Sequence, residues 1–109
     1  MSTISVAPVS VAALTRYRKK TIYVRMAGEV DIAVEPALGD AIDRLVALTP
    51  QSVEVDLTLV TFGGTSLANF FARVYCVIPE GATMVVHGAC PSVRRVLEAT
   101  GIGELVSLR

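Results

Sequence analysis

Apolar and polar positions along the chain predict strands and helices that follow one another in turn. Two runs rich in β-branched and apolar residues, Ser10–Arg16 and Thr21–Met26, are separated by a short basic gap and predict an antiparallel hairpin. Ala27 and Gly28 are expected to end the second strand, and Glu29–Glu35 is expected to be a connecting loop. The chain is therefore predicted to open with a hairpin and to continue through an acidic connection.

Three later segments have the spacing of amphipathic helices. The first is expected to stop at Thr49-Pro50, the second to begin at Thr65 or Ser66 after the break at Gly63-Gly64, and the third to begin near Pro91. The positions expected to face the core are Leu38, Ala41, Ile42, Leu45 and Leu48 in the first helix, Leu67, Phe70, Phe71, Val74 and Ile78 in the second, and Val93, Val96 and Leu97 in the third.

Further strands are predicted between and after these helices. Val53–Val60 and Thr83–His87 have the composition of buried strands, and Leu105–Leu108 is long enough for a short last one. Because helices separate the later strands, the pattern predicts an α/β fold: a mixed sheet of four to five strands, opened by a hairpin, with about three α-helices. We expect residues 1–109 to form a single domain and residues 1–8 to be a flexible N-terminus. In such sheets function is concentrated where strands end and helices begin, which points to Glu29–Glu35 and Thr61–Ser66.

Composition narrows the class of protein. A chain of 109 residues with 52% hydrophobic residues is one small globular domain, not a disordered one. No apolar run is long enough to cross a membrane, and no signal peptide is evident, so a cytoplasmic location is expected. The two cysteines are too few for a disulfide framework and suggest reduced thiols.

Charge is balanced overall but unevenly distributed. With ten basic and ten acidic residues, a general attraction to nucleic acid or to an anionic membrane is not expected. Residues 1–28 contain five basic and no acidic residues, whereas residues 29–109 contain five basic and all ten acidic residues. Such a dipolar surface could orient a protein partner, although Arg18-Lys19-Lys20 could equally be the solvated tip of the hairpin.

Catalytic and metal sites are poorly supported. His87 is the only histidine, and Cys90 follows it just before a helix start that would stabilise a thiolate, but no third residue is suitably spaced. A strand-end histidine and a buried cysteine explain the pair, and a thiol enzyme is kept as an alternative. One histidine and two separated cysteines do not make a metal site, and Gly63–Ser66 lacks the lysine of a phosphate-binding loop. We therefore predict no enzyme activity, no metal and no cofactor.

The hydroxyl pair at the start of the second predicted helix is the remaining candidate for chemistry. Thr65 and Ser66 fall where a helix dipole favours negative charge, and their hydroxyl groups are expected to be exposed to a kinase. A structural role is compatible with this, because Ser and Thr are preferred N-caps.

Three segments in register resemble the STAS domains that act as bacterial anti-sigma factor antagonists. Val53–Leu67 is similar to their strand and helix-start signature, Gly28–Asp31 to their Gly-Glu-Leu-Asp, and Pro91–Ile102 to their third helix. The resemblance implies a non-catalytic domain that binds an anti-sigma factor, often a serine protein kinase, and so frees a sigma factor for RNA polymerase. It also implies that phosphorylation disrupts binding and that a phosphatase restores it, with the acceptor at Thr65 and Ser66 next to it.

Two positions depart from that signature. Gly64 replaces the aspartate before the acceptor, and Leu67 replaces the glycine after the two hydroxyl residues. Thr65–Asn69 is also similar to STAS domains of stressosome-type scaffolds, so a scaffold, or a module that binds a small ligand or nucleotide and is not phosphorylated, is the alternative. A monomer or weak dimer is expected. The residues expected to contact the partner are Asp31, Gly63, Gly64, Leu67, Asn69 and Arg73.

Overall fold

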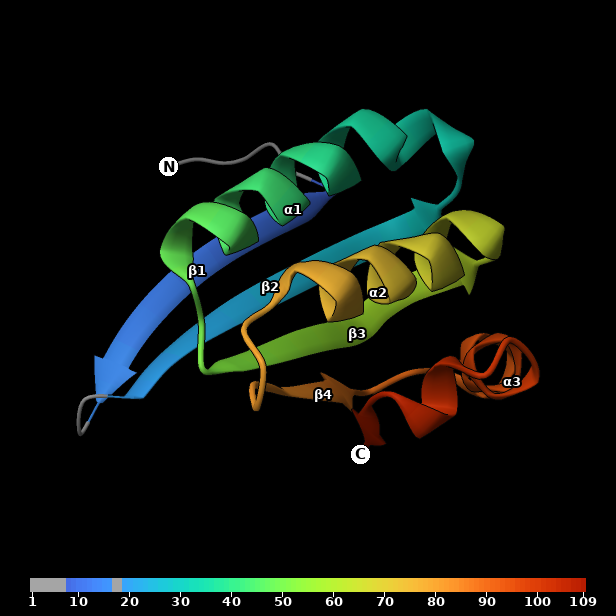
Figure 1. The fold of residues 1–109 in the computed structure, drawn as a ribbon. Helices are drawn as coiled ribbons and strands as arrows, with labels where there is room; N and C mark the ends of the chain where they lie inside the picture. Colours follow the sequence, from blue (N-terminus) through green and yellow to red (C-terminus); the bar gives the residue numbers. More distant parts are fainter. Residues whose placement is uncertain (1–7, 17–18) are drawn as a thin grey trace.

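The computed structural model describes residues 8–16 and 19–109 (Figure 1). The flexible N-terminus predicted for residues 1–8 falls almost entirely outside the described residues, as does Arg18 of the predicted basic turn. In chain order the elements are β1 (Val9–Arg16), β2 (Lys19–Val30), the 3-10 turn η1 (Ile32–Val34), α1 (Glu35–Leu48), β3 (Ser52–Gly63), α2 (Thr65–Val77), β4 (Thr83–His87), α3 (Pro91–Ala99), the 3-10 turn η2 (Ile102–Glu104) and β5 (Ser107–Leu108).

The strands of the described residues form one mixed sheet of five strands in the order β1-β2-β3-β4-β5. β1 pairs with β2 in antiparallel fashion, and each later strand pairs in parallel with the one before it. The predicted fold class, a mixed sheet opened by a hairpin with about three helices, is confirmed. None of the helices in residues 8–16 and 19–109 combines the length and the apolar character needed to span a membrane.

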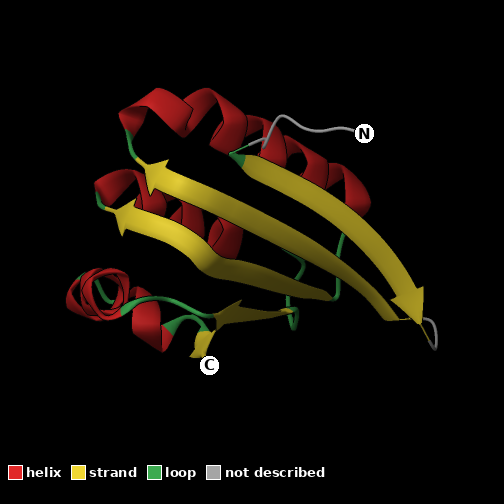
Figure 2. Ribbon diagram, turned by 180° about the vertical axis from the view of Figure 1, so that it is seen from behind, coloured by secondary structure: helices red, strands yellow, loops and turns green. Residues whose placement is uncertain are grey.

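Helices α1 and α2 cover one face of the sheet, and the opposite face is open (Figures 1 and 2). Along β2 and β3, buried residues alternate with exposed or half-buried ones, as expected for strands with a single covered face. The predicted helical stripes supply most of the core on the covered side, with Phe70 and Phe71 in edge-to-face contact at its centre.

The second strand is longer than predicted. Gly28 was expected to end it, but Gly28 adopts a positive φ of 78° at an irregularity in the pairing with β3, and the strand continues to Val30. A glycine tolerates this backbone conformation, so it bends the strand without ending it. The last pair of the ladder joins Val30 to Gly63, and the two segments that follow, which begin at Asp31 and Gly64, therefore leave the sheet side by side.

Candidate docking site at the start of helix α2

The start of α2 lies at the carboxyl edge of the sheet, beside the turn that leads into α1. On the β2 side, Asp31 directly follows the strand, and its Oδ1 accepts a hydrogen bond from the backbone N–H of Ala33 at 3.0 Å, which caps η1. On the β3 side, Gly64 is the N-cap residue of α2, and no side chain caps that helix. The expectation that Thr65 or Ser66 caps α2 is therefore wrong, because both already lie within the first turn.

The two hydroxyl residues have different environments. Thr65 is exposed, whereas Ser66 is only 7% exposed. The expectation of an accessible hydroxyl is thus right for Thr65 and wrong for Ser66. The Ser66 hydroxyl donates a hydrogen bond to Glu35 Oε2 at 2.7 Å, a distance typical of bonds to a charged acceptor. This bond joins the first turn of α2 to the first residue of α1.

Removing the acceptor of this bond is expected to cost more than removing the donor. Glu35→Ala leaves a buried serine hydroxyl unpaired and should lower the free energy of unfolding by about 1–3 kcal/mol. Ser66→Ala leaves only a carboxylate that water can reach, so a loss of about 1 kcal/mol is expected. Urea unfolding measures both, with Asp40→Ala, at another exposed acid of α1, as the control. A Glu35→Ala variant no less stable than Asp40→Ala would contradict this role of the bond.

Two small hollows, each of about 210 Å³, lie on either side of the Glu35–Ser66 bond. Glu35 and Ser66 line both of them. The first, which we call the loop hollow, is also lined by Val30, Asp31, Ile32, Phe62, Gly64 and Thr65. The second, which we call the helix hollow, is also lined by Leu38, Asn69, Phe70, Ala72 and Arg73. The structure thus brings Asp31, Gly64, Thr65, Ser66, Asn69 and Arg73 of the predicted site onto one continuous region.

Gly63 and Leu67, also predicted to contact a partner, are buried and line neither hollow. Leu67 is fully buried in the core, and a Cβ on Gly63 would collide with its side chain. These two residues fix the position of the helix start from within, because the missing side chain at Gly63 leaves the space that Leu67 fills.

Two exposed apolar side chains in the loop hollow were not singled out from the sequence. Ile32 is 77% exposed and Phe62 is 53% exposed, although both are large hydrophobic residues. They line the same hollow as Thr65. Exposed apolar groups gathered around a concave surface are typical of protein interaction sites.

Comparison with known families gives one match that spans most of the chain. Residues 13–107 match the profile of the family described as Mlab, STAS domain. The chain belongs to the STAS domain family. No curated protein sequence is significantly similar to this STAS domain.

Solved structures share the same fold. An anti-sigma factor antagonist from Mycobacterium paratuberculosis is 26% identical to this STAS domain, with a TM-score of 0.72 over 92% of this chain and 84% of that one. An anti-sigma-factor antagonist domain protein from Planctomyces limnophilus is 20% identical, with a TM-score of 0.67 over 91% and 87% of the two chains. The Bacillus cell fate determinant SpoIIAA in its phosphorylated form is 14% identical, with a TM-score of 0.60 over 92% and 91%.

The departure of this STAS domain from the family signature at Gly64 is not imposed by the backbone. Gly64 has a φ of −112°, which any residue can adopt, and a Cβ built there would meet the Phe62 ring at an ordinary contact distance of 3.5 Å. The aspartate of the signature would therefore fit. In its absence, the carboxylate that contacts Ser66 is that of Glu35, from a different helix.

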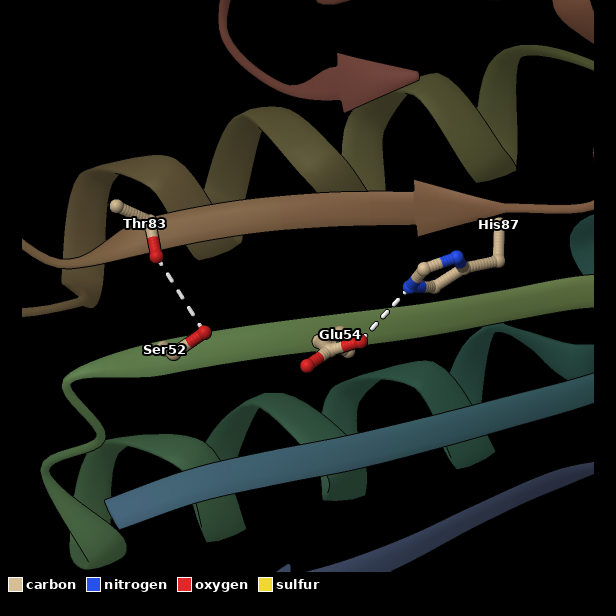
Figure 3. A network of polar contacts seen from close by, with 4 residues as sticks. All are labelled: Ser52, Glu54, Thr83 and His87. Atoms are coloured by element: carbon tan, nitrogen blue, oxygen red, sulfur yellow. Dashed lines mark hydrogen bonds and ion pairs between the residues drawn. The ribbon is translucent and has the colours of Figure 1, made fainter. Parts of the chain in front are cut away.

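His87, the candidate base of a thiol enzyme, is engaged on the open face of the STAS sheet. Its Nε2 lies 2.7 Å from Glu54 Oε1 on the neighbouring strand β3, and Ser52 and Thr83 form a second cross-strand hydrogen bond further along the same strands (Figure 3). His87, at the end of β4, therefore links this strand to β3 through its contact with Glu54.

Cys90 is the N-cap residue of α3 and is half-buried. Its Sγ lies 3.4 Å from the Ser92 hydroxyl, and this hydrogen bond, followed by one from the Val93 backbone N–H, lowers the pKa of the thiol. The pKa of the thiol is thus lowered as expected, with the Ser92 hydroxyl as the main cause and the backbone N–H groups of the helix start as a smaller one. No group of three or more His, Cys, Asp or Glu side chains suited to a metal ion occurs in the part of the chain that the structure describes.

A wider hollow of about 550 Å³ lies on the open face, away from the hydroxyl pair. The charges that line it are paired with one another: Arg25 Nη2 lies 3.4 Å from Asp56 Oδ2, and His87 contacts Glu54. Hydrogen bonds from Thr58, above all, and the Arg25 guanidinium lower the pKa of Asp56, so its carboxylate stays ionised. These pairs stabilise contacts between strands, and the residues predicted for docking do not line this face.

Proposed function

We propose that this STAS domain is an anti-sigma factor antagonist: a non-catalytic regulator that binds an anti-sigma factor of the serine-kinase type and so releases a sigma factor. The likeness at 26% identity to a protein described as an anti-sigma factor antagonist supports the proposal. We further propose that the region around the two hollows, which we call the docking surface, makes the contact.

The observation that carries this proposal is the setting of Thr65. Its exposed side chain lines the same hollow as the exposed side chains of Ile32 and Phe62. The two large apolar side chains can pack against a partner. A kinase can change the charge beside them by phosphorylating the Thr65 hydroxyl. A phosphate on Thr65 would place nearly two negative charges among groups that must lose water when a partner binds, and desolvating an unpaired charge is costly.

We propose Thr65, and not Ser66, as the phosphoacceptor. A kinase must reach the hydroxyl oxygen, and that of Ser66 is buried and bonded to Glu35. A phosphate on Ser66 would also lie against the Glu35 carboxylate, where like charges repel. In the phosphorylated domain a phosphatase would restore binding by removing the charge from Thr65.

Glutamate at position 65 is expected to weaken binding of the anti-sigma factor by about 10- to 100-fold, because it places a charge in the apolar part of the docking surface. Thr65→Ala should bind as the wild type does. Calorimetric titration with the anti-sigma factors encoded by the same genome measures both, and mass spectrometry after incubation with the kinase locates the phosphate.

The matched control is Thr83→Glu, which adds the same charge at an exposed threonine at the start of β4 that lines neither hollow. Equal affinities of Thr65→Glu and wild type would exclude the charge switch while leaving the antagonist function standing. Failure of every anti-sigma factor to bind the wild-type domain would exclude the function itself.

A further inference from the structure

We propose that the outer edge of β1 pairs with the β1 edge of a second copy of this chain, in antiparallel fashion about a two-fold axis at Ala13. The two edges of the described sheet differ greatly. β5, at one edge, has two residues, whereas β1, at the other, has eight that pair with β2 without a register shift. A long, regular edge strand presents backbone groups to which another strand can bond.

The outward backbone groups of β1 follow from its register. Ala27 N–H donates to Pro8 O at 3.0 Å, which makes Pro8 and Ala27 a hydrogen-bonded pair of the antiparallel ladder. Because such pairs alternate along a ladder, the N–H and C=O groups of Val9, Val11, Ala13 and Thr15 point away from β2. Among the described residues, one contact reaches these groups, a long one of 3.4 Å from Arg44 Nη2 to Val11 O.

Within its own sequence the middle of β1 lacks the devices that usually protect an edge strand, and Arg44 of α1 is the one described charge that reaches it. No charged residue, proline or bulge interrupts residues 9–15, and Leu14 on the open face is 46% exposed. Pairing about Ala13 would set Ala13 opposite its own copy and Val11 opposite Thr15 of the second copy. Leu14 would then meet Ala12 of the second copy, so that its exposed apolar surface becomes covered.

The distribution of charge favours a second copy in this orientation. α1 runs in the same direction as β1, since Arg44 reaches Val11 O and Lys20 Nζ bonds to Leu48 O at the hairpin end. The basic hairpin end, with exposed Lys19, would therefore lie in an antiparallel pair beside the first half of the other copy's α1, which carries exposed Asp40. Parallel pairing would instead bring the two basic ends together, where they would repel.

No β1 residue lines either hollow of the docking surface, so pairing through β1 leaves both docking surfaces of the dimer open. The dimer therefore does not depend on the proposed function. Its effect would be to present two docking surfaces on one particle, which raises the effective affinity for a partner that is itself dimeric.

Sedimentation equilibrium of the purified chain of residues 1–109 tests the proposal. Over about 10 µM to 1 mM, the range for weak, small interfaces, the mean mass is expected to rise from that of a monomer towards that of a dimer. Leu14→Lys should raise the dimer dissociation constant about tenfold or more, because each interface gains two charges beside its axis. Leu59→Lys, at a leucine that is 55% exposed on β3, should leave it unchanged. A mean mass that stays monomeric throughout, or equal effects of the two lysine variants, would overturn the proposal.

A second pair of variants tests the register itself. Ala13→Pro removes an N–H that points away from β2, so it should abolish dimers while thermal unfolding still shows a folded domain. Ala12→Cys with Leu14→Cys, in a chain whose Cys76 and Cys90 are replaced by serine, should form disulfide-linked dimers, because these residues would be directly opposite at a spacing that suits a disulfide. Dimers that persist in Ala13→Pro, or that fail to cross-link, would overturn the pairing proposed here.

Discussion

Replacing Phe62 with alanine is expected to weaken binding of the anti-sigma factor by about 30-fold or more. Large aromatic side chains near the centre of an interface commonly contribute about 2 kcal/mol or more to binding. Phe62 has this position on the docking surface, since it lines the loop hollow together with Thr65 and more than half of its surface is open to solvent. Because Phe62 is exposed, the fold depends little on it. Interface mutations mostly change the dissociation rate, so the loss of affinity should appear there.

Tyr75→Ala provides the matched control, because Tyr75 is an aromatic residue of similar exposure that lines neither hollow. Surface plasmon resonance should show normal affinity for Tyr75→Ala and fast dissociation for Phe62→Ala. If Phe62→Ala binds like the wild type, the docking surface has been placed on the wrong part of the molecule, even if the domain does bind an anti-sigma factor.

Leu67→Ala is expected to lower the free energy of unfolding by about 2–5 kcal/mol, the range for removing a buried leucine side chain from a packed core. The cost should be near the upper end, because Leu67 is fully buried and fills the space beside Gly63 at the junction of β3 and α2. A domain of this size has only about 5–15 kcal/mol of stability in total. Leu67→Ala should therefore unfold at a much lower urea concentration.

Val46→Ala, a similar deletion at an exposed position of α1, should change stability by no more than about 0.5 kcal/mol. Binding measured well below the unfolding transition separates the two roles that the sequence suggested for Leu67. If Leu67→Ala remains as stable as the wild type but loses affinity, Leu67 contacts the partner, and the assignment of its side chain to the core is wrong.

Local patterns were sufficient to predict the fold of this chain. Apolar spacing at 3.6 residues placed the three helices, and runs of β-branched and apolar residues placed the strands. Leu67 shows where such patterns become ambiguous. The sequence placed it both in the buried stripe of a helix and on the docking surface, and only the packing of α2 against the sheet puts its side chain in the core.

The details of the candidate site depend on contacts between distant segments. Ser66 is buried because α1 and α2 pack together, and its partner Glu35 is 31 positions away along the chain. Two register shifts between β2 and β3 put Val60 and Gly63 on the covered face, and Phe62 between them is left exposed. A signal was available in the sequence for Phe62, namely an aromatic residue directly before the glycine pair that precedes the predicted helix.

The last rung of the ladder between β2 and β3, Val30 with Gly63, has a practical consequence for engineering partner choice. The two segments that emerge there, 31–35 and 64–66, are held together by the Glu35–Ser66 bond. Transplanting either segment alone from a related domain would break that tether and misalign the other. To change the partner that this protein binds, both segments should therefore be replaced together, so that the serine and its glutamate come from the same domain.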